Sequence, residues 1–237
     1  MKERVINLLK LIIALVLFFN ISNYIIILFH HLGIDTTIFD PKDIGYLNAL
    51  IEGTFVILLI ILYRKYFVED LNDYKLNQKN YINKIFMYIA IFFAIKIFSS
   101  VITSLIAGLL GMEIGDSENQ KTIIAIAKHA PIMMFLSASI LAPIVEEGIF
   151  RLGLKKVIGN KYLFILSSGL IFGFMHIFPT DLSLSVALTY SITYVTMGVY
   201  LAYVYEETDN IWIPIMIHVF NNLLSMLAII LIGWLNI

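Results

Sequence analysis

The sequence predicts an all-α protein, a polytopic transmembrane bundle of about seven or eight helices. Of its 237 residues, 60% are hydrophobic and only 14% are charged, whereas soluble domains carry roughly 25% charged residues. The mean hydropathy is +0.90. Apolar windows of about 20 residues, the length that crosses a bilayer, recur along the whole chain.

Seven apolar windows predict membrane helices. The first follows a charged amino terminus, and because no small-residue cleavage site interrupts its apolar run, it is predicted to be a retained span rather than a signal peptide. A short helix at 122–129, just before Pro131, would raise the total to eight. The predicted spans are residues 5–30, 44–63, 85–111, 131–156, 162–178, 186–205 and 211–233.

Basic residues mark every second connection between these spans. They occur at the amino terminus, in the polar segment 64–84 and around 151–161, whereas the loop 206–210 breaks the pattern because it carries no Lys or Arg. The positive-inside rule therefore predicts a cytoplasmic amino terminus. Segment 64–84 is predicted to be a cytoplasmic linker between an amino-terminal helix pair, 1–63, and a helical bundle, 85–237.

Composition also excludes several functions. The net charge is -1 and the basic residues are scattered, so a nucleic-acid partner is not expected. With no cysteine, thiol catalysis, disulfides and cysteine metal sites are excluded. Membrane lipid is the expected partner. The amino-acid composition is rich in Ile, Asn and Lys, which is typical of proteins from AT-rich bacterial genomes. The expected location is therefore a bacterial cytoplasmic membrane.

Two adjacent acids, Glu146 and Glu147, lie inside an apolar run. A carboxylate at the centre of a membrane helix costs roughly 2.5 to 3.5 kcal/mol, so such acids indicate a functional site. Residues four apart share a helix face, and Glu147 is therefore predicted to pair with Arg151. Glu146 has no partner on its own helix, which suits a general base. The alternative is that both acids face the neighbouring basic loop.

Three further polar residues lie in later spans. Phe172 and His176 share one face, as do His218 and Asn222. At 1.5 Å per residue, Glu146, His218 and Asn222 lie about 12 to 18 Å from the ends of their helices, whereas His176 lies about 22 Å from Lys161. A strong tilt or a broken fifth helix would be needed to bring His176 to Glu146. Each pair alone is more typical of a packed helix.

Other buried polar groups have structural interpretations. Glu52 and Lys96 are expected to pair with each other or to reach the membrane interface. Tyr190 and Tyr194 share a face that could line a cavity, and His129 is expected at a helix boundary.

Together, Glu146-Glu147-x-x-x-Arg151, Phe172-x-x-x-His176 and His218-x-x-x-Asn222 resemble the motifs of the CAAX prenyl endopeptidase and bacteriocin-processing family, also called Abi. The resemblance covers about residues 125 to 232. It implies an intramembrane endopeptidase whose partner is a peptide or membrane-anchored protein substrate and whose cavity opens to the cytoplasmic side. Carried over, Glu146 and His176 would activate a water, His218 and Asn222 would hold the oxyanion, and Glu147, Arg151 and Phe172 would support the site.

The cofactor and two other functions stay open. No cofactor is favoured, because a His–Asn pair on one face is more typical of an oxyanion donor pair; zinc held by Glu146, His176 and His218 is the alternative. A non-catalytic membrane protein of the same fold, serving bacteriocin immunity or scaffolding, is the first alternative function. A proton-coupled transporter that uses Glu52, Glu146 and His176 as a relay is the second.

Overall fold

The computed structural model describes residues 2–112, 118–178 and 182–235, except for the side chains of 118, 119 and 233–235. Every regular element in these ranges is helical, which confirms the predicted fold class. The elements are α1 (Lys2–His31), η1 (Thr36–Ile38), α2 (Pro41–Leu62), α3 (Arg64–Leu76), α4 (Gln78–Leu109), α5 (Glu118–Ala127), α6 (Pro131–Leu136), η2 (Ser137–Leu141), α7 (Ala142–Glu147), η3 (Gly148–Gly153), α8 (Lys161–Met175), α9 (Leu184–Thr208) and α10 (Trp212–Leu235).

Six helices in the described part of the chain are long and apolar enough to cross a membrane. They are α1, α2, α4, the continuous helix Pro131–Gly153, α9 and α10. The helix α8 is apolar but has only 15 residues, which at 1.5 Å per residue is about 22 Å, short of a hydrocarbon core of about 30 Å. The fifth predicted span, 162–178, therefore ends inside the bundle.

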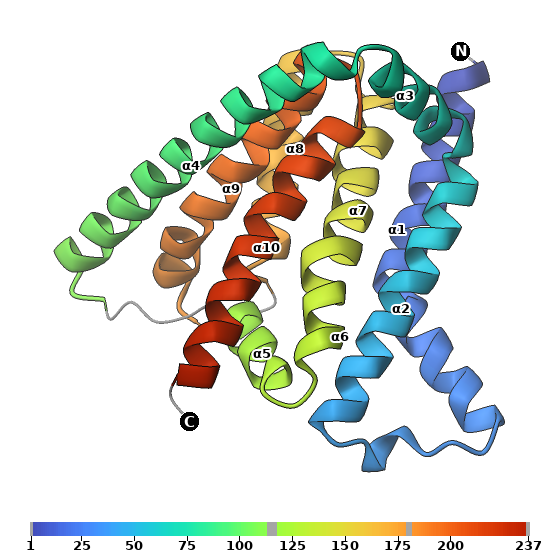
Figure 1. Cartoon of the computed structure of the whole chain (residues 1–237), viewed down its shortest axis with the longest axis vertical. Helices are drawn as coiled ribbons and strands as arrows, with labels where there is room; N and C mark the ends of the chain where they lie inside the picture. The colour runs from blue at the N-terminus through green and yellow to red at the C-terminus, as the bar shows by residue number, and fades with distance from the viewer. Residues whose placement is uncertain (1, 113–117, 179–181, 236–237) are drawn as a thin grey trace.

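The polar segment 64–84 is helical, and α3 lies across one end of the bundle (Figure 1). The side-chain amide of Asn210 donates to the Asp70 carbonyl oxygen at 2.7 Å, and the Ile211 backbone N–H donates to Asp70 Oδ2 at 2.8 Å. The indole N–H of Trp212 donates to the Phe67 carbonyl at 3.0 Å. These bonds fasten α3 to the loop that precedes α10.

The basic connections meet at a single end of the molecule. The amino terminus and α3 lie together at the top of Figure 1, and Arg4 Nε donates to the Val157 carbonyl in the loop after η3 at 2.9 Å. Every second connection between membrane spans must lie at the same end of the bundle, and the basic connections do so. The side of the membrane on which this end lies stays a prediction.

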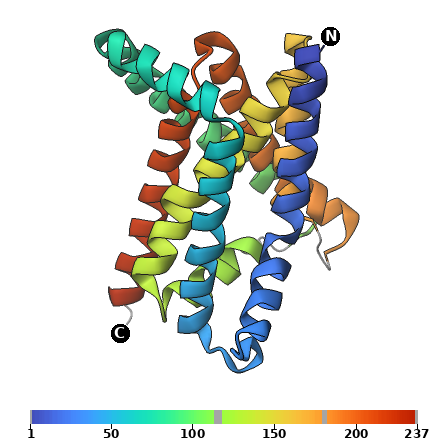
Figure 2. The same cartoon turned by 90° about the vertical axis from the view of Figure 1, so that its right-hand side faces the viewer.

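The amino-terminal helix pair packs on the helix that carries the two acids. Figure 2 shows α1 and α2 side by side on this flank. A Cβ atom added at Gly148 would lie 2.1 Å from Leu59 of α2, and one at Gly153 would lie 2.9 Å from Leu11 of α1. Both glycines therefore permit this close packing. The division into residues 1–63, 64–84 and 85–237 stays a prediction.

Two glycines bring α8 against α9. A Cβ atom at Gly169 would lie 2.7 Å from the backbone nitrogen of Val199, and one at Gly173 would lie 2.6 Å from that of Val195. Small residues four apart allow two helix backbones to approach closely in lipid. This close approach fixes the position of His176 at the end of α8.

Candidate active site

The two acids lie on a helix that is interrupted on both sides. The short α7 carries Glu146 and Glu147 between two π-helical segments, η2 and η3. Pro143 follows η2 and has no N–H to donate to the preceding turn, which breaks the regular bonding pattern. Single π-helical turns are rare in proteins and are frequent at functional sites.

Glu147 and Arg151 form the predicted ion pair, with 3.0 Å between Glu147 Oε2 and Arg151 Nε and no exposed side-chain surface on either residue. The Nε–H does not point along this line, so the contact is ionic rather than an aligned hydrogen bond. The guanidinium lies 4.5 Å from the ring centroid of Phe172 and donates from Nη2 to the Gly198 carbonyl at 3.2 Å. The pair thus joins the helix of the acids to α8 and α9.

Glu147 has a second partner that the sequence did not indicate. Its Oε1 atom lies 2.8 Å from His218 Nδ1 on α10, at hydrogen-bond distance. The motif in the sequence shows only the partner four residues away on the same helix. A contact between two helices has no comparable signal.

Glu146 faces two histidines. Its Oε2 atom lies 3.8 Å from His176 Nε2 and 3.8 Å from His218 Nε2. This oxygen is buried and has no hydrogen-bond partner among the described residues. One carboxylate oxygen therefore lies between two imidazole nitrogens, at separations too long for direct hydrogen bonds.

The structure closes the predicted depth gap between His176 and Glu146. Side chains lean toward the amino-terminal end of their own helix, and α7 and α8 run in opposite directions. Glu146 and His176 therefore lean toward each other. The helix α8 is continuous from Lys161 to Met175 and His176 is its capping residue, so a broken fifth helix is not what brings His176 to Glu146.

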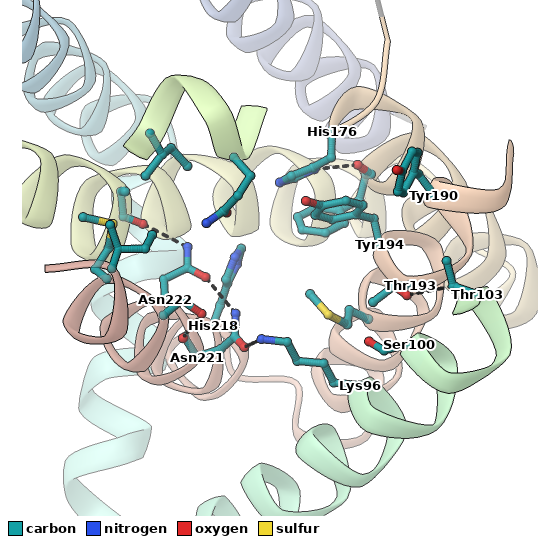
Figure 3. A pocket seen from close by; sticks show the side chains of 18 of the residues that line it. Lys96, Ser100, Thr103, His176, Tyr190, Thr193, Tyr194, His218, Asn221 and Asn222 are labelled. Atoms are coloured by element: carbon teal, nitrogen blue, oxygen red, sulfur yellow. Dashed lines mark hydrogen bonds between the residues drawn. The ribbon is translucent and has the colours of Figure 1, made fainter. Parts of the chain in front are cut away.

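The imidazole of His176 is held on several sides. Its Nδ1 atom lies 2.9 Å from the Phe172 carbonyl oxygen, and the Phe172 ring lies 4.4 Å from it between centroids. Tyr194 of α9 stacks on the imidazole at 4.8 Å (Figure 3). These contacts direct Nε2 toward Glu146. The contact with Phe172 confirms the predicted support.

Asn222 is held in place by two hydrogen bonds. Its Nδ2 donates to the Ala138 carbonyl in η2 at 2.9 Å, and its Oδ1 accepts from Asn221 Nδ2 at 2.8 Å. One N–H of the Asn222 amide has no partner in these bonds. That N–H is available to a ligand in the cavity.

A cavity of about 370 Å³ lies beside these groups (Figure 3). His176, His218 and Asn222 line it, and Tyr190 and Tyr194 do so as the sequence suggested. The other lining residues come from α4, α5, η2, α8, α9 and α10, on the half of the bundle away from the amino terminus. The resemblance implies that the cavity opens at the end of the bundle that carries the basic connections. The positions of the lining residues give no support for an opening at that end.

The predicted pair of Glu52 and Lys96 does not form. Glu52 Oε2 accepts a hydrogen bond from Ser137 in η2 at 2.7 Å, and Lys96 Nζ donates to Asn221 Oδ1 at 2.7 Å. Each therefore has a closer partner on another helix. His129 lies in the turn between α5 and α6, at a helix boundary as predicted.

The donor atoms are of the types that bind zinc. Both imidazoles present Nε2 to Glu146, while each Nδ1 contacts an oxygen atom, a pattern typical of metal-bound histidines. In the described part of the chain, no group of three His, Asp or Glu side chains has metal-binding spacing. The donor chemistry of Glu146, His176 and His218 fits zinc, although the side chains would have to move closer together.

A family model matches the part of the chain that carries this site. Residues 128–224 match the model described as type II CAAX prenyl endopeptidase Rce1-like, and this segment contains all three motifs. This part of the chain is therefore similar to the Rce1-like family. The matched range lies within the predicted region of about 125 to 232 and includes Glu146, His176, His218 and Asn222.

Three curated relatives extend the comparison. The chain is 34% identical over 110 residues to the "Putative membrane peptidase YdiL" of Bacillus subtilis, covering 45% of this chain and 41% of that protein. It is 30% identical over 141 residues to the UPF0177 protein YvdC of Lactococcus lactis, covering 58% and 51%. It is 29% identical over 197 residues to an uncharacterised protein of Mycoplasma capricolum, covering 77% and 55%.

The chain spans about half the length of these relatives. No solved structure matches it significantly.

Proposed function

We propose that the chain is an intramembrane endopeptidase that hydrolyses a peptide bond in a membrane-associated protein or peptide. The observation that carries this proposal is the buried Glu146 oxygen, which lies 3.8 Å from the Nε2 atoms of both His176 and His218 beside a cavity. The similarity to the Rce1-like family and the name of the Bacillus relative support the same reaction class.

Glu146 and His176 are suited to activate a water. A gap of 3.8 Å between a carboxylate oxygen and an imidazole nitrogen is bridged naturally by a water that donates to both. As the water oxygen attacks the scissile carbonyl carbon, its proton passes to Glu146. The same proton then goes to the leaving amine as the carbon–nitrogen bond breaks.

His218 and Asn222 are suited to stabilise the oxyanion of the tetrahedral intermediate. His218 donates from Nε2 when both of its ring nitrogens carry protons, and its Nδ1 atom lies 2.8 Å from Glu147 Oε1. The remaining amide N–H of Asn222 is a second donor. Removing one such donor from an enzyme costs about 2.7 to 4 kcal/mol in barrier height.

Zinc is the second candidate for water activation, favoured by the contacts of both Nδ1 atoms with oxygens. Glu146, His176 and His218 would hold the ion, which would supply a polarised water. Metal analysis of the purified chain, with cleavage measured before and after chelation, separates the two versions. We expect substoichiometric zinc and chelator-resistant cleavage, whereas stoichiometric zinc and loss of cleavage would establish the metal version.

The proposal is tested by cleavage of a library of short synthetic peptides by the full chain in detergent. New termini are identified by mass spectrometry. Glu146→Gln and His176→Ala are expected to lower kcat at least about a hundredfold, as loss of a general base commonly does. Glu69→Gln and His31→Ala make the same chemical changes at exposed positions outside the site, and they are expected to match the unmodified chain.

Two results would contradict the proposal, one by removing the assigned residue roles and one by favouring another function. Cleavage that persists in both Glu146→Gln and His176→Ala would contradict the assigned roles. If no chain cleaves any peptide, but proteoliposomes transport solute under a pH gradient, the proton-coupled transporter would be favoured. Cleavage in detergent needs no gradient, so these outcomes are distinct.

A further inference from the structure

A lysine lines the cavity close to the proposed oxyanion donor. Lys96 of α4 donates to Asn221 Oδ1 at 2.7 Å, and Asn221 in turn donates to Asn222 Oδ1 at 2.8 Å. Asn221 lies three residues after His218, which is about 4.5 Å along a helix. The ammonium of Lys96 therefore contacts a residue that lies within one helical turn of His218 and next to Asn222.

Lys96 belongs to a polar stripe on α4. Ser100, Thr103 and Ser104 follow it at intervals of four, seven and eight residues, and all four side chains line the cavity. Residues at these spacings share one helix face. The neighbouring residues Ile97, Phe98 and Val101 are exposed on other faces of the helix, where lipid would cover them. The stripe therefore faces inward, as a lining of the cavity.

The charge of Lys96 is not balanced by an acid in the described part of the cavity wall. The lining residues include one lysine and two histidines but neither Asp nor Glu. Among the described residues, the one oxygen that its ammonium contacts belongs to the neutral amide of Asn221. An ammonium at membrane depth usually pairs with an acid or marks a ligand path. It has three N–H donors, of which Asn221 uses one.

We propose that Lys96 binds a carboxylate of the substrate peptide and thereby selects which peptides are cleaved. This inference rests on the proposed endopeptidase function and names a feature of its substrate. The carboxylate is either the carboxyl terminus of the peptide or an Asp or Glu side chain near the scissile bond. A charge-assisted hydrogen bond is stronger than one between neutral groups and is geometrically specific, so Lys96 acts on specificity rather than on bond cleavage.

The test compares peptides that differ only in charge. Each peptide that the full chain cleaves is made as a carboxyl-terminal free acid and as an amide, and kcat/KM is measured for both. The free acid is expected to be preferred about tenfold or more, mainly through KM. In Lys96→Gln this ratio is expected to fall close to one, and Lys96→Arg is expected to keep most of it.

A second set of peptides distinguishes the two sources of the carboxylate. All are amides, with Glu or Gln at one position near the cleavage site. A preference for Glu that depends on Lys96 assigns the carboxylate to a side chain, and a preference confined to the free acids assigns it to the carboxyl terminus. Lys84→Gln removes a lysine from the same helix outside the cavity, so it controls for the loss of a charge.

Equal ratios in the unmodified chain and Lys96→Gln, in both sets, would overturn the inference while leaving the endopeptidase intact. If nothing is cleaved, binding of fluorescent free-acid and amide peptides to the Glu146→Gln chain still tests it. Equal affinities for the free acids and the amides, together with equal affinities for the Glu and Gln amides, would contradict it. Displacement of the labelled peptides by phosphatidylglycerol from the unmodified chain, but not from Lys96→Gln, would also contradict it, because Lys96 would then bind a lipid phosphate.

Discussion

At the scale of single residues, the carboxylate of Glu147 holds two parts of the site at once. One oxygen pairs with Arg151 on its own helix, and the other lies 2.8 Å from His218 on α10. Both Glu147 and Arg151 are completely buried. Removing one partner of a buried ion pair leaves the other charge without compensation, which is far costlier than losing an exposed pair.

Glu147→Gln tests this role. The change keeps the shape of the side chain but leaves Arg151 unpaired, so we expect a loss of about 3 to 5 kcal/mol in the free energy of unfolding. Glu206→Gln, which removes a partly exposed partner of Lys155, should cost no more than about 1 kcal/mol. Unfolding of the purified chain in detergent measures both. Equal stability of the two variants would contradict a structural role for Glu147.

At the scale of helices, the contact between α8 and α9 places His176 in the site. The backbone of Val195 leaves no space for a Cβ atom at Gly173. Because His176 lies three residues later, a shift of α8 there would move its imidazole away from Glu146. The position of His176 in the proposed site therefore depends on a glycine that does not line the cavity.

Gly173→Ala should force the two helices apart, with a cost of about 1 to 3 kcal/mol and a clear loss of cleavage. Gly108→Ala is the matched control, because a Cβ atom there meets nothing within 4 Å. It should be neutral or slightly stabilising, since alanine favours a helix over glycine by about 1 kcal/mol. Thermal unfolding and peptide cleavage measure both effects. Unchanged cleavage in Gly173→Ala would show that α8 tolerates displacement.

The helix α3 contributes a stability that depends on pH. A hydrogen bond from the Tyr81 hydroxyl, with help from Asn210 and Asn77, lowers the pKa of Asp73. An acid whose pKa is lowered on folding stabilises the fold above its unfolded pKa, about 3.9, and this contribution is lost as pH falls through the folded value.

Asp73→Ala should therefore destabilise the chain at neutral pH and have a smaller effect below about pH 4. Asp43→Ala, in the cap of α2 at the other end of the molecule, is a control for loss of an acid away from α3. Unfolding curves across this pH range measure the difference. An effect of Asp73→Ala that grows on acidification would have the wrong sign for this account.

At the scale of the whole molecule, the sequence predicted the order and approximate bounds of the membrane helices, because the apolar windows are long and separated by polar residues. It also predicted the pairing of Glu147 with Arg151, because residues four apart on a helix always lie close. It did not predict the neighbours of Lys96 or Glu52, since these depend on which helices pack together. The position of His176 was uncertain because distances along helix axes ignore the direction in which side chains lean.

The orientation of the bundle in the membrane stays a prediction. The basic connections share one end of the bundle, and the positive-inside rule places that end in the cytoplasm. Since the chain contains no cysteine, single cysteines can be introduced without background. Lys75→Cys on α3 should resist a membrane-impermeant maleimide in intact cells, whereas Lys42→Cys at the opposite end should react. The reverse labelling pattern would place the amino terminus outside.

The most direct test of the account is hydrolysis of the peptide library in water enriched in heavy oxygen. If Glu146 activates a water for attack on the scissile carbonyl, each new carboxyl terminus carries one heavy oxygen atom, in the unmodified chain and in Glu69→Gln alike. The Glu146→Gln chain should produce no new termini. New termini in equal amounts from Glu146→Gln, or none from the unmodified chain, would contradict an endopeptidase centred on Glu146.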